Sequence, residues 1–471
     1  MNISRPFFPI NRIHRNGHFQ TYSYCSCFTG IANESFPLFF LRARCLEMDI
    51  TTDVLIVGAG GGGAVLSIAL ARKGIANLVL EQAAGPPQGL RGEILQPNGQ
   101  ALLHTLGLLE KLPPHASKPV RLFHFRQCGG QRLCTIDYEM LSPPFNRALV
   151  MWPNVVHHTI LDCLQQENPD GLSFHATFKS FLRNGKQIIG AQAEIGGASL
   201  QIGARVVVGA DGPFSQVREA MGISASLHRY TDSYLVAALD SPEVLDEAQY
   251  YVGQKTILGL FPAPEQKVYA LYMVSSDSLA ALKAKGVGPL REKWKAIAPD
   301  LAPVFDSLVD WNQTAYMGTG RVRAKTWAID GAVLMGDAAH GMNPHASQGR
   351  MQAMVDAVTL ADVLEDCQRR QDWSMNALHP FEAARRSQVT MLQQLADEEV
   401  FFWNTGNPIL GMLRDRVFRT MDTNRRLQYQ VLSATAGLRT TSPFGWLDRF
   451  QAAGFLPDPR ANQVPGPMQL A

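Results

Sequence analysis

The chain has little of several features that would define its class at once. Its formal net charge is only +2 over 471 residues, so no basic excess marks a nucleic-acid-binding protein. Its 7 cysteines show no metal-ligand spacing; Cys25 and Cys27 are separated by one residue, and the others are scattered. We therefore expect reduced thiols, a cytoplasmic location, no bound metal and no nucleic-acid partner.

Long apolar runs are also lacking, with one exception. The stretch Val54–Ala71 carries no charge and would be selected by a simple scan for membrane spans. Its cluster of glycines interrupts it after a short β-branched run, which favours a strand, a turn and a helix of a water-soluble domain.

The first 47 residues fit nothing that follows. They are rich in Arg, Ser, Phe and Cys, poor in acids, and show no cleavage pattern of a secretory signal. We favour Met48 over Met1 as the physiological start; the alternative is an organellar transit peptide, which shares this composition. In either case we expect residues 1–47 to be poorly ordered.

The segment Asp53–Glu81 has the order of a dinucleotide-binding unit. Val54–Val57 reads as a buried parallel strand, and Gly58, Gly60 and Gly63 follow at the spacing that gives a tight turn, a close approach to pyrophosphate and close helix packing. Glu81 lies at roughly the 20-residue distance where a carboxylate accepts hydrogen bonds from a ribose. The predicted contacts here are Gly58, Ala59, Gly60, Gly63, Glu81 and Gln82.

A second segment, Gly336–Gly349, indicates which nucleotide is bound. It follows the apolar run Ala332–Met335 and reads Gly-Asp, then a loop with Pro344, then Gln348-Gly349 before a helix. Here the chain resembles the flavin-dependent aromatic hydroxylases, the family of p-hydroxybenzoate and ubiquinone-pathway hydroxylases. The resemblance implies that Asp337 binds the ribityl chain of FAD and that the helix N-terminus faces the flavin pyrimidine oxygen, where it stabilises negative charge.

The flavin contacts that this resemblance predicts are Asp337, Pro344, Gln348, Gly349, Arg350 and Met351. The family usually has Gly at the position of Ser347 and Asn at that of Met351, so the chain departs from the pattern twice.

Two further segments match the family between these motifs. The resemblance places Arg91 near the FAD pyrophosphate, where a guanidinium pairs well with phosphate, and Asp211 in a turn linked to FAD and nicotinamide binding. For Asp211, a purely local role at a strand end with a helix capped by Ser215 is the alternative. Asn154 stands where the family often has a cofactor-touching Arg or Gln, and this match is poor.

The predicted fold class is α/β. We expect a Rossmann-like FAD-binding domain in two pieces, 49–228 and 320–370, with an inserted substrate-domain sheet at 229–319 and a helical region at 371–471. Strands are predicted at Leu172–Phe181, Gln187–Ile195 and Ser199–Val208, and in the inserted sheet at Tyr234–Asp240, Glu247–Val252, Thr256–Pro262 and Lys267–Val274. Tyr250, Tyr251, Tyr269 and Tyr272 of that sheet are candidate pocket residues, half of which should point into a core.

In the C-terminal region, one helix presents Leu410, Leu413, Val417 and Met421 on a single face, with several arginines nearby. A basic amphipathic helix can lie on a membrane, but we favour a helix that packs against the domain with its arginines in solvent.

The resemblance implies an FAD-dependent monooxygenase that uses NADH or NADPH and O2 to hydroxylate an aromatic, polyketide-like or quinone-like molecule through a flavin C4a-hydroperoxide. The cofactor carries the difficult chemistry, and His340 and His345 are weighed as bases but favoured as loop-packing residues. The alternatives are a reductase, dehydrogenase or halogenase of the same superfamily, and a non-catalytic FAD-binding protein. We expect a monomer or homodimer; substrate identity and the choice between NADH and NADPH stay open.

Overall fold

The computed structural model describes residues 48–90, 93–241 and 245–464, so Arg91 and the N-terminal extension lie outside the described residues. Its main sheet has the strand order β19-β20-β11-β1-β2-β8 within those ranges, and its central pairs are parallel. The strands are β1 (Ile50–Val57), β2 (Asn77–Leu80), β8 (Leu172–Ser173), β11 (Ala198–Gly209), β19 (Ala328–Ile329) and β20 (Ala332–Leu334).

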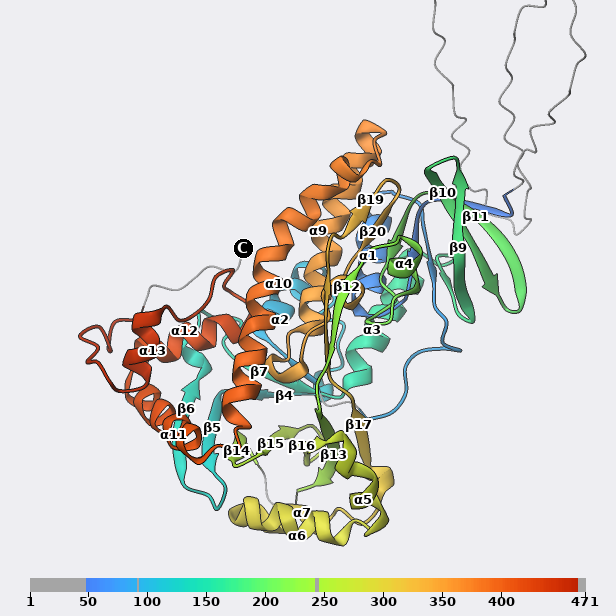
Figure 1. Ribbon diagram of the computed structural model, residues 1–471. Coiled ribbons are helices and arrows are strands. Elements are labelled where there is room, and N and C mark those ends of the chain that lie inside the picture. Colours follow the sequence, from blue (N-terminus) through green and yellow to red (C-terminus); the bar gives the residue numbers. More distant parts are fainter. Residues whose placement is uncertain (1–47, 91–92, 242–244, 465–471) are drawn as a thin grey trace, which may run out of the picture.

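The centre of this sheet is apolar because helices cover it. Val54, Leu55 and Ile56 of β1 have no exposed surface, as expected of a parallel strand between helical layers. The helices packed around it are α1 (Gly61–Arg72), α3 (Pro153–Glu167) and α9 (Gly349–Arg370) (Figure 1). The predicted strand, turn and helix at Val54–Ala71 are therefore confirmed.

An antiparallel arm extends from the main sheet. β9 (Ala176–Asn184) pairs with β10 (Gln187–Ile195), which pairs with β11, and strands are predicted in all three ranges (Figure 1). The single strand expected at Leu172–Phe181 is instead two strands, β8 and β9, because His175 takes a positive φ of 50° between them. The break lets β8 join β2 in the main sheet while β9 joins the arm.

A second sheet has the order β17-β13-β16-β15-β14-β5-β6 in the described part of the chain. The four strands predicted between Tyr234 and Val274 are all present, but β5 and β6 come from 122–137, a range that we expected inside the FAD-binding domain. The strands are β5 (Leu122–Gln127), β6 (Arg132–Asp137), β13 (Asp232–Asp240), β14 (Ala248–Gly253), β15 (Thr256–Ala263), β16 (Lys267–Ser275) and β17 (Thr314–Met317).

Each face of the second sheet has its own core. Tyr251 and Tyr272 lie in a cluster with Trp294 of α6 (Gly288–Ile297), whereas Tyr250 and Tyr269 lie on the side of the C-terminal helices. Helices α5 (Leu279–Ala284) and α7 (Ala302–Phe305) accompany α6 below the sheet (Figure 1). Two of the four tyrosines thus lie on the α6 face of the sheet and two on the opposite face, as the alternation of strand residues requires.

The remaining elements connect these layers. Small sheets are formed by β3 (Glu93–Leu95), β7 (Ala148–Met151) and β4 (Ser117–Val120), and by β12 (Ala225–Arg229) with β18 (Gly320–Ala324). Short helices are α2 (Pro97–Thr105), α4 (Gln216–Ala220), α8 (Asp337–His340), η2 (Tyr138–Met140) and η6 (Pro344–Ala346).

The C-terminal region is helical, as predicted: α10 (Met375–Trp403), α11 (Pro408–Thr423), α12 (Arg425–Thr435) and α13 (Trp446–Ala452). The arginines divide into two groups. Arg414 and Arg426 are buried in ion pairs with neighbouring aspartates, whereas Arg416 and Arg419 are exposed as expected.

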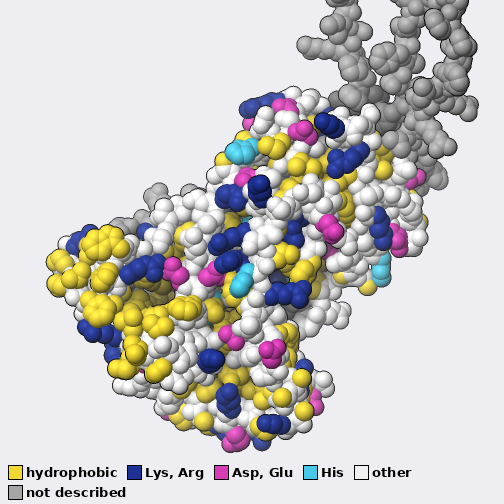
Figure 2. Space-filling model, in the orientation of Figure 1, with side chains coloured by type: hydrophobic (Ala, Val, Ile, Leu, Met, Phe, Trp, Pro, Cys, Tyr) yellow, Lys and Arg dark blue, Asp and Glu magenta, His cyan; other side chains and the backbone are white. Residues whose placement is uncertain are grey.

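The outer surface of these helices carries apolar side chains, which gather over α11 and α13 (Figure 2). The exposed large side chains there are Phe401, Ile409, Met412, Trp446, Leu447, Phe450, Phe455 and Leu456. The inner surface of α11 packs Phe418 and Met421 into the core beside the second sheet. None of the helices in the described ranges is both long and apolar enough to pass through a bilayer.

Candidate functional site

The glycine turn after β1 leaves space that a ligand can fill. Gly58 has φ +104°, and a Cβ there or at Gly63 would overlap a backbone carbonyl oxygen, of Ala210 and of Gly58 respectively. At Gly60, by contrast, a Cβ would meet no atom within 4 Å. Gly58 and Gly63 are therefore required by the turn itself, whereas the backbone at Gly60 borders open space.

The neighbouring groups suit an anionic dinucleotide. Helix α1 begins at Gly61 without a side-chain cap and without an acidic residue in its first turn, so its N–H groups are available to a phosphate. Glu81, at the end of β2, accepts hydrogen bonds from the backbone N–H groups of Ala59 and Ala83, both at 2.8 Å. A carboxylate has further lone pairs for ribose hydroxyls, and the side chain of Gln82 beside it is exposed.

Asp337 occupies the first position of α8, directly after β20. Its side chain is accessible to solvent, yet the protein around it raises its pKa by desolvation; His340 lowers this pKa and Asp356 raises it. Among the described residues the carboxyl group has no hydrogen-bond or ion-pair partner. An accessible acid without a protein partner fits the hydroxyls of a ribityl chain.

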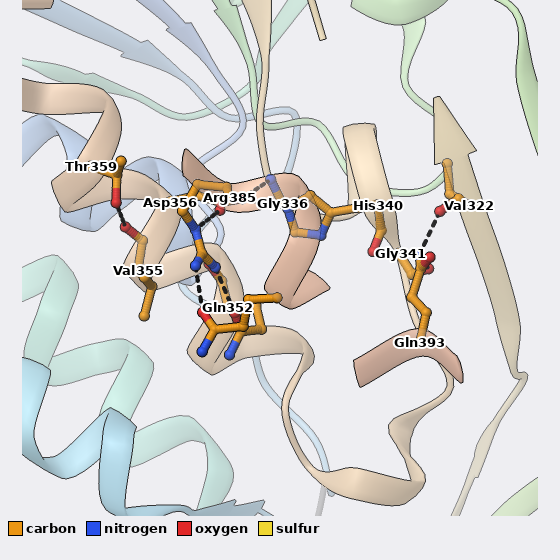
Figure 3. Close-up of polar contacts among 11 residues, drawn as sticks. Val322, Gly336, His340, Gly341, Gln352, Val355, Asp356, Thr359, Arg385 and Gln393 are labelled. Atoms are coloured by element: carbon orange, nitrogen blue, oxygen red, sulfur yellow. Dashed lines mark hydrogen bonds and ion pairs between the residues drawn. The ribbon is translucent and has the colours of Figure 1, made fainter. Parts of the chain in front are cut away.

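The turn before Asp337 is held by a buried polar network (Figure 3). Asp356 of α9 is fully buried and accepts hydrogen bonds from Gly336 N at 2.9 Å, from His340 Nε2 at 2.5 Å and from Arg385 Nε at 2.8 Å. Arg385 also donates to Gln352 Oε1 at 2.5 Å. Burial alone would raise the pKa of Asp356, but His340, Arg385 and the Gly336 N–H lower it below its usual value.

The loop between α8 and α9 contains the other predicted flavin contacts. Pro344 starts the short helix η6, Ser347 takes a left-handed conformation with φ 53°, and Gly349 starts α9, which has no side-chain cap and no acid in its first turn. This α9 N-terminus therefore offers backbone donors, as the resemblance implies. A left-handed residue explains why Gly is usual in the family at the position of Ser347.

Three of the predicted contacts in this region have other partners. The Gln348 side chain is fully buried and bonds to Asn98 and to Thr435 O, so only its backbone is available to a cofactor. Met351 is buried and its sulfur packs against Gly99. Arg350 extends its aliphatic stem over Gly61, at the start of α1.

The Asp211 segment lies against the glycine turn but is engaged locally. Asp211 accepts hydrogen bonds from Ser215 Oγ at 2.5 Å and from Val217 N at 3.1 Å, which fixes the start of α4. Arg218 donates to Ala338 O at 2.7 Å and so braces α8. These contacts agree with the alternative role of Asp211, which is to fix a strand end and the following helix. A contact between Asp211 and the cofactor stays a prediction.

The Asn154 side chain donates a hydrogen bond to Gly89 O at 2.8 Å.

An apolar cavity of about 70 Å³ lies between the second sheet and the C-terminal helices. It adjoins the predicted flavin loop, because His345 and Ser347 line it. The other lining residues are Ile94, Gln96, Phe123, Phe125, Ile136, Tyr138, Tyr250, Glu399, Trp403, Phe418, Met421, Val431, Leu432 and Thr435. In the described part of the chain this lining contains no lysine or arginine.

The ionisable groups of the cavity wall differ in the pH at which they change charge, and Tyr138, Tyr250 and His345 stay neutral around pH 7. Burial raises the pKa of Tyr138 and of Tyr250, and burial lowers the pKa of His345 to about 4. His345 Nδ1 lies 2.6 Å from the hydroxyl of Tyr234, and its ring meets Trp403 edge-on at 4.6 Å. Glu399 differs from them: burial raises its pKa to about 8, so its carboxyl group is mostly neutral at pH 7 and gains its charge just above that pH.

Glu399 is not among the residues predicted from the sequence, although the spacing of apolar residues along its helix could have identified it. Leu392, Leu395 and Ala396 are buried on α10, and Glu399 and Trp403 continue the same helical spacing. A carboxyl group on the apolar stripe of a helix is unusual enough to mark a site.

Comparisons with known proteins agree with this geometry. A family profile described as FAD binding domain matches residues 51–392. The 6-methylpretetramide 4-monooxygenase of Streptomyces rimosus is 30% identical over 343 residues, which are 72% of this chain and 81% of that enzyme. A kynurenine 3-monooxygenase of Salinispora tropica is 28% identical over 78% of this chain and 81% of its own length.

Solved structures show the same fold. The p-nitrophenol 4-monooxygenase of Pseudomonas putida superposes with a TM-score of 0.73 at 19% identity, covering 83% of this chain and 100% of that structure. A probable FAD-dependent monooxygenase of Pseudomonas aeruginosa gives a TM-score of 0.65 at 23% identity, over 78% and 98% of the two chains.

The open space at Gly60 gives a first prediction. Gly60→Ala should fold with a free energy of unfolding within about 1 kcal/mol of the original, because its Cβ meets no protein atom. It should weaken FAD binding about tenfold or more, since the methyl group would occupy the approach to pyrophosphate. Flavin-fluorescence titration and thermal unfolding measure the two effects. Gly288→Ala, equally uncrowded but on α6, is the control; equal FAD affinity in both variants would refute the assignment.

Removing the Asp337 carboxyl group tests the ribityl contact. Asp337→Ala should lower FAD affinity by about 1.5–3 kcal/mol, or roughly 10- to 150-fold, because hydrogen bonds to a charged acceptor are lost. Equilibrium dialysis against FAD measures this loss, and Asp362→Ala, at an exposed site on α9, controls for charge. Full FAD occupancy in Asp337→Ala would contradict the ribityl role.

Proposed function

Because this chain belongs to the FAD binding domain family of flavin-dependent monooxygenases, we propose that it uses NAD(P)H and O2 to hydroxylate an aromatic, polyketide-like or quinone-like small molecule. The chain is an FAD-dependent oxidoreductase. The substrate, the reductant and the use of O2 are the parts that the proposal adds.

One observation carries the proposal: the apolar cavity and the predicted flavin loop share residues. His345 and Ser347 belong to the loop that leads into α9 and also line the cavity. A ring held among Phe125, Trp403 and Phe418 would therefore lie next to the flavin ring. Ligand sites between two domains are the usual arrangement, and an apolar wall keeps water away from the reacting atoms.

Bound FAD would supply the redox chemistry, taking a hydride from NAD(P)H and activating O2. The residues of this chain have two other tasks. Glu81, Asp337 and the N-termini of α1 and α9 hold the cofactor, and the aromatic side chains of the cavity position the substrate ring by stacking.

The charge of the cavity wall favours a substrate without a carboxylate. In the described residues the lining offers no cation to pair with one, and burying an unpaired carboxylate is costly. Two relatives are named for 6-methylpretetramide and for kynurenine. For this chain, a neutral polycyclic phenol or quinone suits the cavity wall better than a charged amino acid does. Because 70 Å³ holds only about two waters, a ring system requires α11 and α12 to shift outward.

A panel assay tests the function. The FAD-loaded protein should oxidise NADH or NADPH slowly alone and faster with neutral phenols, hydroxyquinones or aromatic polyketides, with a hydroxylated product detected by mass spectrometry. Carboxylated forms of the same rings should stimulate less. Acceleration without an oxygenated product would favour a reductase or dehydrogenase, and no acceleration by any compound would favour a non-catalytic flavoprotein.

A further inference from the structure

Glu399 lies in the last turn of α10, and its side chain lines the cavity together with Trp403, one turn further along. The side chain is half-buried. In the described part of the chain it has no hydrogen-bond or ion-pair partner. A carboxyl group left unpaired in an apolar wall is costly for folding, which suggests that it is kept for another purpose.

The groups around Glu399 cannot take up or release a proton at neutral pH. Tyr138 of η2, Tyr234 of β13 and Tyr250 of β14 have raised pKa values, mainly through burial, and His345 of the η6 loop has a pKa of about 4. The described cavity residues of α11 and α12 are apolar or, in Thr435, a hydroxyl.

Glu398, the preceding residue on α10, points to the surface and pairs with Arg449 at 2.8 Å. Its charge adds to the effect of burial in raising the pKa of Glu399. Among the described residues that line the cavity, Glu399 is thus the one whose side chain changes its charge close to neutral pH.

We propose that Glu399 is a catalytic residue, the general base that accepts the proton of a ring hydroxyl while the substrate is hydroxylated. This inference rests on the proposed function. It narrows the substrate class to rings that carry a hydroxyl group which can face the α10 wall of the cavity.

The proton transfer is balanced without any further reagent. The O–H bond of the substrate breaks, a new O–H bond forms on the Glu399 carboxylate, and the negative charge passes to the ring oxygen. The electron-rich phenolate ring is the better acceptor of an electrophilic oxygen atom. After the transfer Glu399 can return the proton to the ring oxygen of the product, so the residue ends as it began.

Burial makes Glu399 a suitable base for this step. A phenol has a pKa near 10, so a glutamate of ordinary pKa, about 4.3, is a weak acceptor for its proton. A carboxyl group with a pKa of about 8 is a far stronger base and is still partly ionised at neutral pH.

The test compares Glu399→Gln with the original protein and with Glu398→Gln, a matched change one residue away on the outer face. All three are loaded with FAD and assayed with a phenol that the panel shows to be hydroxylated. Glu399→Gln should keep its FAD content and its reduction by NAD(P)H but form product roughly 100- to 10,000-fold more slowly. Glu398→Gln should be close to the original.

The pH profile separates a base from a merely structural residue. Product formation by the original protein should rise about tenfold per pH unit and level off near pH 8, because the active form is the carboxylate. Glu398→Gln should shift this limb slightly to lower pH, since a like charge is removed, and Glu399→Gln should lack it. The loss in Glu399→Gln should also shrink with more acidic, nitro-substituted phenols, which need a base less.

The assays distinguish a failure of the role of Glu399 from a failure of the proposed function. If the original protein hydroxylates the phenol and Glu399→Gln does so equally fast with the same pH limb, Glu399 is not the base. If the original protein forms no product from any phenol, the proposed function itself fails, and the role of Glu399 fails with it.

Discussion

The buried carboxylate of Asp356 is the interaction on which the rest of the site depends. It joins the turn at Gly336, the short helix α8 through His340, and the long helix α10 through Arg385. The three partners lie 20, 16 and 29 residues from Asp356 in the sequence, and each of them is buried (Figure 3). Removing one member of such a network leaves charge uncompensated in the interior, which typically costs about 3–5 kcal/mol. The turn before Asp337 and the helix α8 are therefore held in place by one acid.

Helix α10 connects this network to the apolar cavity. Arg385 stands beside Asp356, and Glu399 stands further along the same helix, about 21 Å away at 1.5 Å per residue. One helix thus joins the turn before Asp337 to a wall of the apolar cavity (Figure 1). The cavity is completed by α11 and α12, and Phe418 of α11 stacks on Phe125 of the second sheet with ring centroids 4.8 Å apart.

Local patterns made the cofactor half of the protein predictable. Gly58 and Gly63 are required by backbone geometry, so their spacing predicts the turn, and Asp337 follows a buried strand in a motif that the family shares. Four strands of the second sheet, β13 to β16, are also predicted, because their alternation is local. The sequence predicts the position of Gln348 in the loop. It does not predict that the Gln348 side chain bonds to Asn98, because the two residues lie 250 positions apart.

The substrate half depends on long-range pairing and was predicted less well. Strand β5 joins the second sheet by pairing with β14, more than one hundred residues later in the sequence, and β6 joins it by pairing with β5. Nothing in the sequence of β5 specifies β14 as its partner. The role of Glu399 is hidden for the same reason. The sequence shows that Glu399 lies on the apolar stripe of α10. It does not show the cavity, because the opposite wall is formed by Phe123 and Tyr138, which lie far from α10 in the sequence.

The central claim is that this chain transfers one oxygen atom from O2 to an aromatic ring beside its flavin. The most direct measurement is mass spectrometry of the product formed under isotopically labelled O2 in ordinary water. The account predicts one labelled oxygen atom in each product molecule. A product whose new oxygen comes from water, or labelled hydrogen peroxide with the aromatic compound unchanged, would contradict it.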